Sequence, residues 1–181
     1  MKTAIIGIGN ILFKDEGVGV YAARYLQSNY DIDAHIIDGG TLGFKLMRYY
    51  QEYDNVIILD TISIEDEPGS VYNIPSDVLL GLGTYKKTAH EVEVVEMLEI
   101  CSLLEQIAKV NIIGIVPQDI QSVEIGLSDR LKERFGGFVD EVLKELQRQH
   151  IAYSPKEGDT LDEIIYTYAN PTMRDLDDNQ I

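Results

Sequence analysis

Short apolar runs alternate with segments of helical periodicity along the first 150 residues of the chain. The apolar runs are typical of strands buried on both faces of a sheet. The segments between them repeat apolar residues at helical spacing, which predicts helices. The predicted strands are residues 3–8, 34–37, 56–59 and 110–116, and the predicted helices are residues 16–28, 42–50, 90–107 and 128–149. This alternation favours a single α/β domain over residues 1–150, with a mostly parallel, twisted sheet and helices on both faces.

Two stretches depart from this alternation. Residues 70–74 follow the turn signal Pro68-Gly69 and predict a short edge strand. Residues 151–181 contain seven acidic and two basic residues and show little periodicity. We therefore expect residues 151–181 to form an acidic C-terminal tail that packs poorly against the domain.

The charge balance narrows the choice of partners. The 181 residues include 31 acidic and 15 basic side chains, which gives a formal net charge of −16. Nucleic acids and anionic membranes bind positive patches, so neither is an expected partner. No apolar stretch reaches transmembrane length and the N-terminus lacks a signal-peptide pattern, so we expect a cytoplasmic protein, by default a monomer. The single cysteine, Cys101, is interpreted as a buried structural thiol.

Glu16, Asp60 and His90 are the main candidates for chemistry, because each is expected just beyond the C-terminal end of a predicted strand. In open α/β sheets, sites form in the crevice outside these strand ends. Two carboxylates and one imidazole suit a divalent transition metal. Asp15 is expected to cap the following helix, and Glu16 is expected to stay ionised in the first turn of that helix.

The position of His90 also fits a metal ligand. Thr88 and Glu91 have the spacing of a capping box, which places His90 in the first turn of a helix, where the dipole disfavours the charged imidazolium. Neutral imidazole is the form that binds metal. Taken singly, each candidate also has an ordinary interpretation as a helix cap, a turn residue or a surface histidine. His35 and His150 lack comparable settings and are interpreted as structural.

The glycine-rich turn after the first strand has a second interpretation. Gly7-Ile8-Gly9-Asn10 follows a strand and precedes a helix, as in a dinucleotide-binding turn, with Asp38 placed to contact a ribose. Leu12 stands where the third glycine of that motif belongs. Asp15 and Glu16 would repel a pyrophosphate at the helix N-terminus. The pattern therefore disfavours nucleotide binding.

Residues 7–19, with the sequence GIGNILFKDEGVG, resemble the N-terminal signature of the hydrogenase maturation endopeptidases. Asp38-Gly39-Gly40-Thr41 is similar to the second motif of that family, and Asp60 and His90 correspond to the remaining positions. The resemblance covers roughly the predicted α/β domain. Val116-Pro117-Gln118-Asp119 departs from the Gln-Pro-like segment expected there, which bears on the substrate loop rather than on the site.

The resemblance implies a cytoplasmic, single-domain α/β enzyme. Members of this family remove a C-terminal extension from the large subunit of nickel-iron hydrogenase after nickel has been inserted. The resemblance implies that Glu16, Asp60 and His90 bind nickel, and that this nickel is carried by the substrate. Asp38 matches a further family aspartate.

Two mechanisms stay open at this point. The metal could position the cleavage segment and polarise its carbonyl or a water. Alternatively, an aspartate, Asp60 or Asp38, could act as general base in the manner of an aspartic protease. A non-catalytic, metal-sensing protein that binds the hydrogenase precursor would use the same ligands and is the alternative function.

Overall fold

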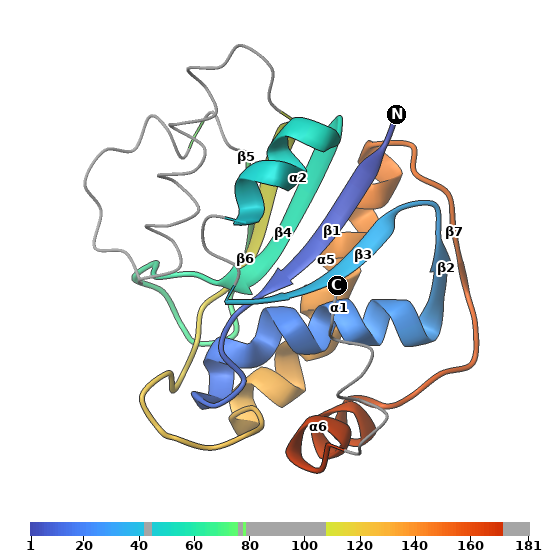
Figure 1. Ribbon diagram of the computed structural model, residues 1–181. Helices are drawn as coiled ribbons and strands as arrows, with labels where there is room; N and C mark the ends of the chain where they lie inside the picture. The colour runs from blue at the N-terminus through green and yellow to red at the C-terminus, as the bar shows by residue number, and fades with distance from the viewer. Residues whose placement is uncertain (42–44, 76–77, 79–107, 172–181) are drawn as a thin grey trace.

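The computed structural model describes residues 1–41, 45–75, 78 and 108–171. A five-stranded sheet with the order β3-β1-β4-β6-β5 forms its centre (Figure 1). The strands are β1 (Thr3–Ile8), β3 (His35–Gly40), β4 (Asn55–Thr61), β5 (Val71–Pro75) and β6 (Lys109–Ile115). Strands β1, β3, β4 and β6 run parallel, and β5 is an antiparallel edge strand. The mostly parallel sheet and the predicted edge strand are thus confirmed. The predicted helix 90–107, with His90 and Cys101, lies outside the described residues.

Helices cover both faces of the sheet, as predicted. They are α1 (Val18–Asn29), α2 (Leu46–Glu52) and α5 (Asp129–Arg148). Side chains alternate between the two faces of a strand. Ile57 and Leu59 of β4 therefore join the core beneath α1 and α5, while Val56 and Ile58 join the core beneath α2. Within the described ranges, no helix combines the length and the apolar character needed to cross a membrane.

The start of α1 approaches the sheet so closely that only glycine fits at two positions. A Cβ on Gly7 of β1 would lie 2.1 Å from the carbonyl oxygen of Gly19. A Cβ on Gly19 would lie 2.1 Å from the carbonyl oxygen of Leu59. These glycines let the N-terminal end of α1 press against the carboxyl ends of β1 and β4, where the candidate residues lie.

Residues 151–171 pack against the domain, and the predicted poorly packed tail is therefore wrong for this segment. Strand β7 (Tyr153–Pro155) pairs antiparallel with β2 (Tyr30–Ile32), and α6 (Leu161–Ala169) follows. Ile164 of α6 is 2% exposed and belongs to the core shared with α1 and α5. The acidic composition led to the wrong prediction, because the segment also carries apolar side chains that pack on the core.

Two local signals could have revealed α6. Thr160 and Glu163 form a reciprocal capping box at its start. Four apolar residues of α6 then recur with helical spacing and pack on the core: Leu161, Ile164, Ile165 and Tyr168. The pairing of β7 with β2 joins distant parts of the chain, so no local pattern predicts it.

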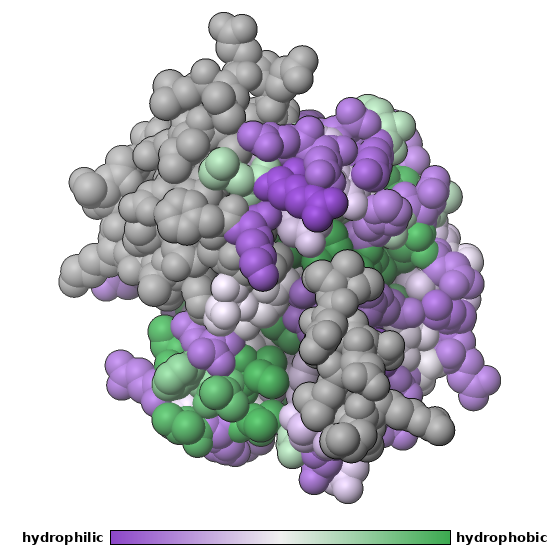
Figure 2. All heavy atoms as spheres, viewed as in Figure 1, coloured by the Kyte–Doolittle hydropathy of each residue, from purple (hydrophilic) through white to green (hydrophobic). Residues whose placement is uncertain are grey.

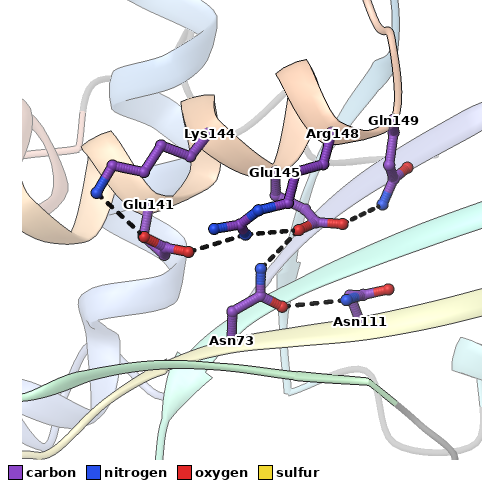
Figure 3. A network of polar contacts seen from close by, with 7 residues as sticks. All are labelled: Asn73, Asn111, Glu141, Lys144, Glu145, Arg148 and Gln149. Carbon is purple, nitrogen blue, oxygen red and sulfur yellow. Dashed lines mark hydrogen bonds and ion pairs between the residues drawn. The ribbon is translucent and has the colours of Figure 1, made fainter.

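A polar network fastens α5 to the edge of the sheet (Figure 3). Glu145 is 5% exposed, and its carboxylate accepts hydrogen bonds from Asn73 Nδ2 (2.6 Å), Arg148 Nη1 (3.0 Å) and Gln149 Nε2 (2.8 Å). Asn111 of β6 donates in turn to Asn73 Oδ1 at 3.0 Å. Burial of Glu145 opposes its ionisation most strongly, but the three hydrogen bonds together outweigh burial and hold its pKa below the usual value. The network therefore ties α5 to β5 and β6 through an ionised carboxylate.

Replacing Glu145 with glutamine is expected to lower the free energy of unfolding by about 2 kcal/mol at neutral pH, because a charged acceptor of three hydrogen bonds is lost. The folded-state pKa lies below the usual value of 4.5. The stabilisation is therefore present above that value and is lost as the pH falls through the folded-state pKa. Urea unfolding should show the wild-type advantage shrinking in acid. Glu133→Gln, an exposed change on the same helix, is the control, and an equal loss in both variants would contradict the prediction.

Candidate active site

Glu16 lies in a short 3-10 helix, η1 (Lys14–Gly17), which joins the turn after β1 to α1. Gly9 in that turn has φ 141°, and a Cβ on Gly9 would lie 1.8 Å from the carbonyl oxygen of Glu16. Only glycine combines this conformation with this contact. The half-buried Glu16 is thereby fixed at the carboxyl edge of the sheet, where the sequence predicted it.

Asp60 is the last residue but one of β4, the central strand. The residue is 2% exposed, and its Oδ1 accepts a hydrogen bond from Thr61 N at 2.7 Å. Because η1 packs against β4, Glu16 and Asp60 lie on neighbouring elements at the same edge of the sheet. Both carboxylates therefore lie at the predicted edge of the sheet, but Asp60 lies within the last two residues of its strand and not beyond it as predicted.

The third predicted ligand, His90, lies outside the described residues. Among the residues that the structure describes, no three or more His, Cys, Asp or Glu side chains come close enough together to hold a metal ion. Glu16 and Asp60 would supply the hard oxygen donors of a transition-metal site, and such a site also accepts imidazole nitrogen. The complete ligand set thus stays a prediction.

Asp38 lies near the carboxyl end of β3, and β1 separates β3 from β4. The exposed Asp38 carboxylate accepts hydrogen bonds from Gly40 N (3.2 Å) and from the Tyr168 hydroxyl (2.6 Å). Asp38 therefore shares the sheet edge with Asp60 but has a different environment. Tyr168 was missed by the sequence analysis, because it belongs to the segment that was predicted to pack poorly.

The two described histidines lie elsewhere. His35 opens β3 at the opposite, amino end of the sheet, with Nδ1 2.6 Å from the Tyr53 hydroxyl. His150 follows the C-terminal end of α5 with φ 57°. Both positions agree with the structural interpretation given to these histidines.

Asp15 has a role that the sequence analysis did not find. The predicted helix cap is wrong, because no side chain caps α1 or η1. Asp15 is instead fully buried, with Oδ1 accepting from Ser128 N (2.6 Å) and Oδ2 from Gln118 N (2.9 Å), Asp119 N (2.9 Å) and Ser128 Oγ (2.8 Å). Asp15 therefore joins η1, next to Glu16, to the loop between β6 and α5. Since Gln118 and Asp119 contribute backbone amides, the departure from the Gln-Pro-like pattern leaves these contacts intact.

The loop of residues 117–128 lies alongside the turn that precedes η1. Lys14 N donates to the Glu124 carbonyl (2.9 Å), and Glu124 N donates to the Leu12 carbonyl (3.0 Å). This pairing leaves two apolar side chains in solvent, Leu12 at 50% and Val123 at 79% exposure. Figure 2 shows hydrophobic residues gathered at the lower left, over the region that η1 and this loop occupy in Figure 1.

The same loop carries a strongly acidic carboxyl group. Hydrogen bonds from the Ser122 side chain and from the backbone amides of Ser122 and Gln121 lower the pKa of Asp119 to about 2. Asp119 therefore stays ionised at physiological pH and closes a turn within the loop. Two aspartates thus hold the loop next to Glu16 through hydrogen bonds to its backbone amides. Asp15 does so from η1, and Asp119 does so within the loop itself.

The geometry of the glycine-rich turn also bears on nucleotide binding. In a dinucleotide site, the missing side chain of such a glycine lets the pyrophosphate approach the backbone. Here the Glu16 carbonyl oxygen takes up the space beside Gly9. The turn is therefore filled by the protein itself, in agreement with the sequence-based argument against a nucleotide.

Comparison with known proteins gives a consistent result. The family model described as hydrogenase maturation protease matches residues 20–145. The hydrogenase 2 maturation protease of Escherichia coli K12 is 27% identical over 162 residues, which span 87% of this chain and 98% of the relative. The hydrogenase expression/formation protein HupD of Bradyrhizobium diazoefficiens is 31% identical over 143 residues, which span 77% of this chain and 74% of that protein.

Solved structures agree with the sequence relatives. The hydrogenase maturating endopeptidase HybD from E. coli superimposes with a TM-score of 0.79 at 26% identity, covering 86% of this chain and 98% of HybD. The [NiFe] hydrogenase maturation protease HybD from Thermococcus kodakarensis gives a TM-score of 0.65 at 27% identity, covering 80% of this chain and 99% of that structure. The family model spans well over half of the 181 residues, and the fold is shared. The chain therefore belongs to the hydrogenase maturation protease family.

Proposed function

We propose that this protein is the endopeptidase that removes the C-terminal extension from the nickel-loaded large-subunit precursor of a nickel-iron hydrogenase. The observation that carries the proposal is that Glu16 and Asp60 lie on neighbouring elements at one sheet edge, where the close contacts of Gly9 and Gly19 hold η1 and the start of α1. Family membership supplies the protease role in hydrogenase maturation. We further expect a cytoplasmic monomer that meets its precursor transiently.

Glu16, Asp60 and His90 would recognise the nickel that the precursor carries, so the metal is part of the substrate. Carboxylate oxygens together with an imidazole nitrogen suit a divalent transition metal. The low exposure of Asp60 supports this role, because a charge interaction shielded from water is stronger than one in solvent. A precursor without nickel would lack the contact, so cleavage would follow only after nickel insertion.

We assign the general base to Asp38 and a ligand role to Asp60. A carboxylate that coordinates a metal is less able to take up a proton, and Asp60 is the aspartate whose strand packs against η1, the helix that carries Glu16. Asp38 is exposed and held by Gly40 N and Tyr168. Asp38 would take a proton from water while the water oxygen attacks the scissile carbonyl carbon. The carbon–nitrogen bond then breaks, and the proton passes to the leaving nitrogen.

The decisive experiment is a processing assay with purified protein and nickel-loaded large-subunit precursor. Intact-mass spectrometry should show the large subunit losing the mass of its C-terminal extension, and the nickel-free precursor, as matched control, should keep its mass. Binding of the loaded precursor without any mass loss would contradict the proposal. That result would support the alternative of a non-catalytic, metal-sensing binding protein.

A further inference from the structure

Helix α6 reaches the candidate active site from outside residues 20–145, the part of the chain that the family model matches. The loop before α6 is fixed to the end of α1, because Ser28 Oγ donates to Asp159 Oδ2 (3.0 Å) and accepts from Asp159 N (2.8 Å). Ile164 then anchors the helix in the core. The position of the last turn of α6 is therefore set by contacts along its whole length.

Tyr168, in that last turn, connects α6 to Asp38. Its ring packs edge-on against Tyr21 of α1, with centroids 5.5 Å apart and an interplanar angle of 73°. Its hydroxyl donates to Asp38 Oδ2 at 2.6 Å. Burial, followed by the charge of Asp38 and the hydrogen bond to it, raises the pKa of Tyr168. The hydroxyl therefore keeps its proton at physiological pH and acts as the donor.

We propose that Tyr168 is a positioning residue, which holds the Asp38 carboxylate in place for its role as general base. The inference rests on the proposed function of Asp38. The Tyr168 hydroxyl lies closer to the carboxylate than the Gly40 amide does, at 2.6 Å against 3.2 Å, so it makes the larger contribution to fixing the side chain. A carboxylate offers about four acceptor positions, and two hydrogen bonds leave room for the attacking water.

The contact also has a simpler explanation, in which Tyr168 only helps α6 to pack. Packing depends on the ring, which lies against Tyr21. Positioning depends on the hydroxyl, which touches Asp38. Tyr168→Phe keeps the ring and removes the hydroxyl, and it therefore separates the two explanations. Tyr166→Phe is a matched control, because Tyr166 lies on the same helix and is 69% exposed.

Steady-state cleavage of the nickel-loaded precursor should show the positioning role. We expect Tyr168→Phe to lower kcat about tenfold with KM within about twofold, because a misplaced base slows proton transfer and leaves binding unchanged. Tyr166→Phe should match the wild type. Equal kcat values for Tyr168→Phe and the wild type would overturn the positioning role and leave the proposed function standing. Absence of cleavage by the wild type would overturn the proposed function, and the positioning role with it.

A second measurement does not depend on activity. Urea unfolding of Asp38→Ala, Tyr168→Phe and the double variant forms a cycle that isolates the interaction between the two side chains. A charge-assisted hydrogen bond predicts a coupling of about tenfold in the folding equilibrium constant. A coupling below about twofold would mean that the hydroxyl does not hold the carboxylate, and would overturn the proposal. The same coupling together with an unchanged kcat would mean that the hydrogen bond stabilises the fold without positioning the base, and would also overturn the proposal.

Discussion

Replacing Asp15 with alanine is expected to lower the free energy of unfolding by about 4 kcal/mol, a large share of the roughly 5–15 kcal/mol that stabilises a typical domain. The reason is that four donors lose a fully buried acceptor, and two of these donors, the amide and the hydroxyl of Ser128, are themselves buried. The backbone amides of Gln118, Asp119 and Ser128 and the Ser128 hydroxyl all donate to this carboxylate. An unsatisfied buried donor costs about 1–3 kcal/mol, and water entering the space would recover part of the loss. Urea unfolding at neutral pH measures the difference.

Asp119→Ala is the matched control for Asp15→Ala. Asp119 lies in the loop that Asp15 holds against η1, and it also accepts several hydrogen bonds, from Ser122 and Gln121. These donors are exposed and can turn to water instead. The control should therefore lose much less stability. Comparable losses in the two variants would show that burial of Asp15 is not what makes its contacts important.

Asp15→Ala should also disturb the candidate active site. Asp15 is adjacent to Glu16 and ties η1 to the loop and to Ser128, the N-cap residue of α5. Helix α5 is in turn fastened to the sheet through Glu145. A chain of polar contacts thus runs from strands β5 and β6 through α5 to Asp15, the neighbour of Glu16. The stability of the fold and the placement of Glu16 are therefore coupled through Asp15.

Local patterns were enough to predict most of the central sheet. The run over residues 56–59 became β4, because both faces of that strand are buried. The glycine pair in α5 did not interrupt the helix, since Gly136 and Gly137 lie on its exposed side and no atom lies within 4 Å of a Cβ built at either. The strand-end positions of Glu16 and Asp60 followed from the same patterns, because a parallel sheet brings the carboxyl ends of its strands to one edge.

What the sequence could not show depends on contacts between distant segments. Asp15 has the local appearance of a helix cap, and only the tertiary fold brings Ser128 to its carboxylate. Tyr168 lies in an acidic segment, and its contact with Asp38 spans most of the chain. Composition described the charge of that segment correctly but not its packing, because a few apolar residues at helical spacing are sufficient to dock a short helix.

The second large effect concerns activity, not stability. Asp60→Asn is expected to lower the rate of precursor cleavage about a thousandfold, because the change removes the charge that would bind nickel while keeping the shape of the side chain. Asparagine retains an oxygen that can accept the hydrogen bond from Thr61 N, so the fold should persist. The rate is followed as mass loss of the nickel-loaded large subunit, and circular dichroism checks the fold. His90→Ala should give the same loss of processing.

Asp54→Asn is the control for this variant. Asp54 immediately precedes the amino end of the same strand and accepts a hydrogen bond from Lys2 N at 2.6 Å, far from the carboxyl edge. It should cleave the precursor at the wild-type rate. Full cleavage by both Asp60→Asn and His90→Ala would remove the basis for the proposed nickel ligands.

Comparing Asp60→Asn with Asp38→Asn then separates recognition of nickel from proton transfer. If Asp60 binds the nickel of the precursor, Asp60→Asn should weaken binding of the loaded precursor and abolish the preference for loaded over nickel-free precursor. If Asp38 is the base, Asp38→Asn should retain that preference and lose only kcat, by about a hundredfold or more. Loss of nickel preference in Asp38→Asn instead would place the metal near β3. Asp60 is buried on the central strand, whereas Asp38 is exposed and accepts a hydrogen bond from Tyr168. These different environments favour nickel binding by Asp60 and proton transfer by Asp38.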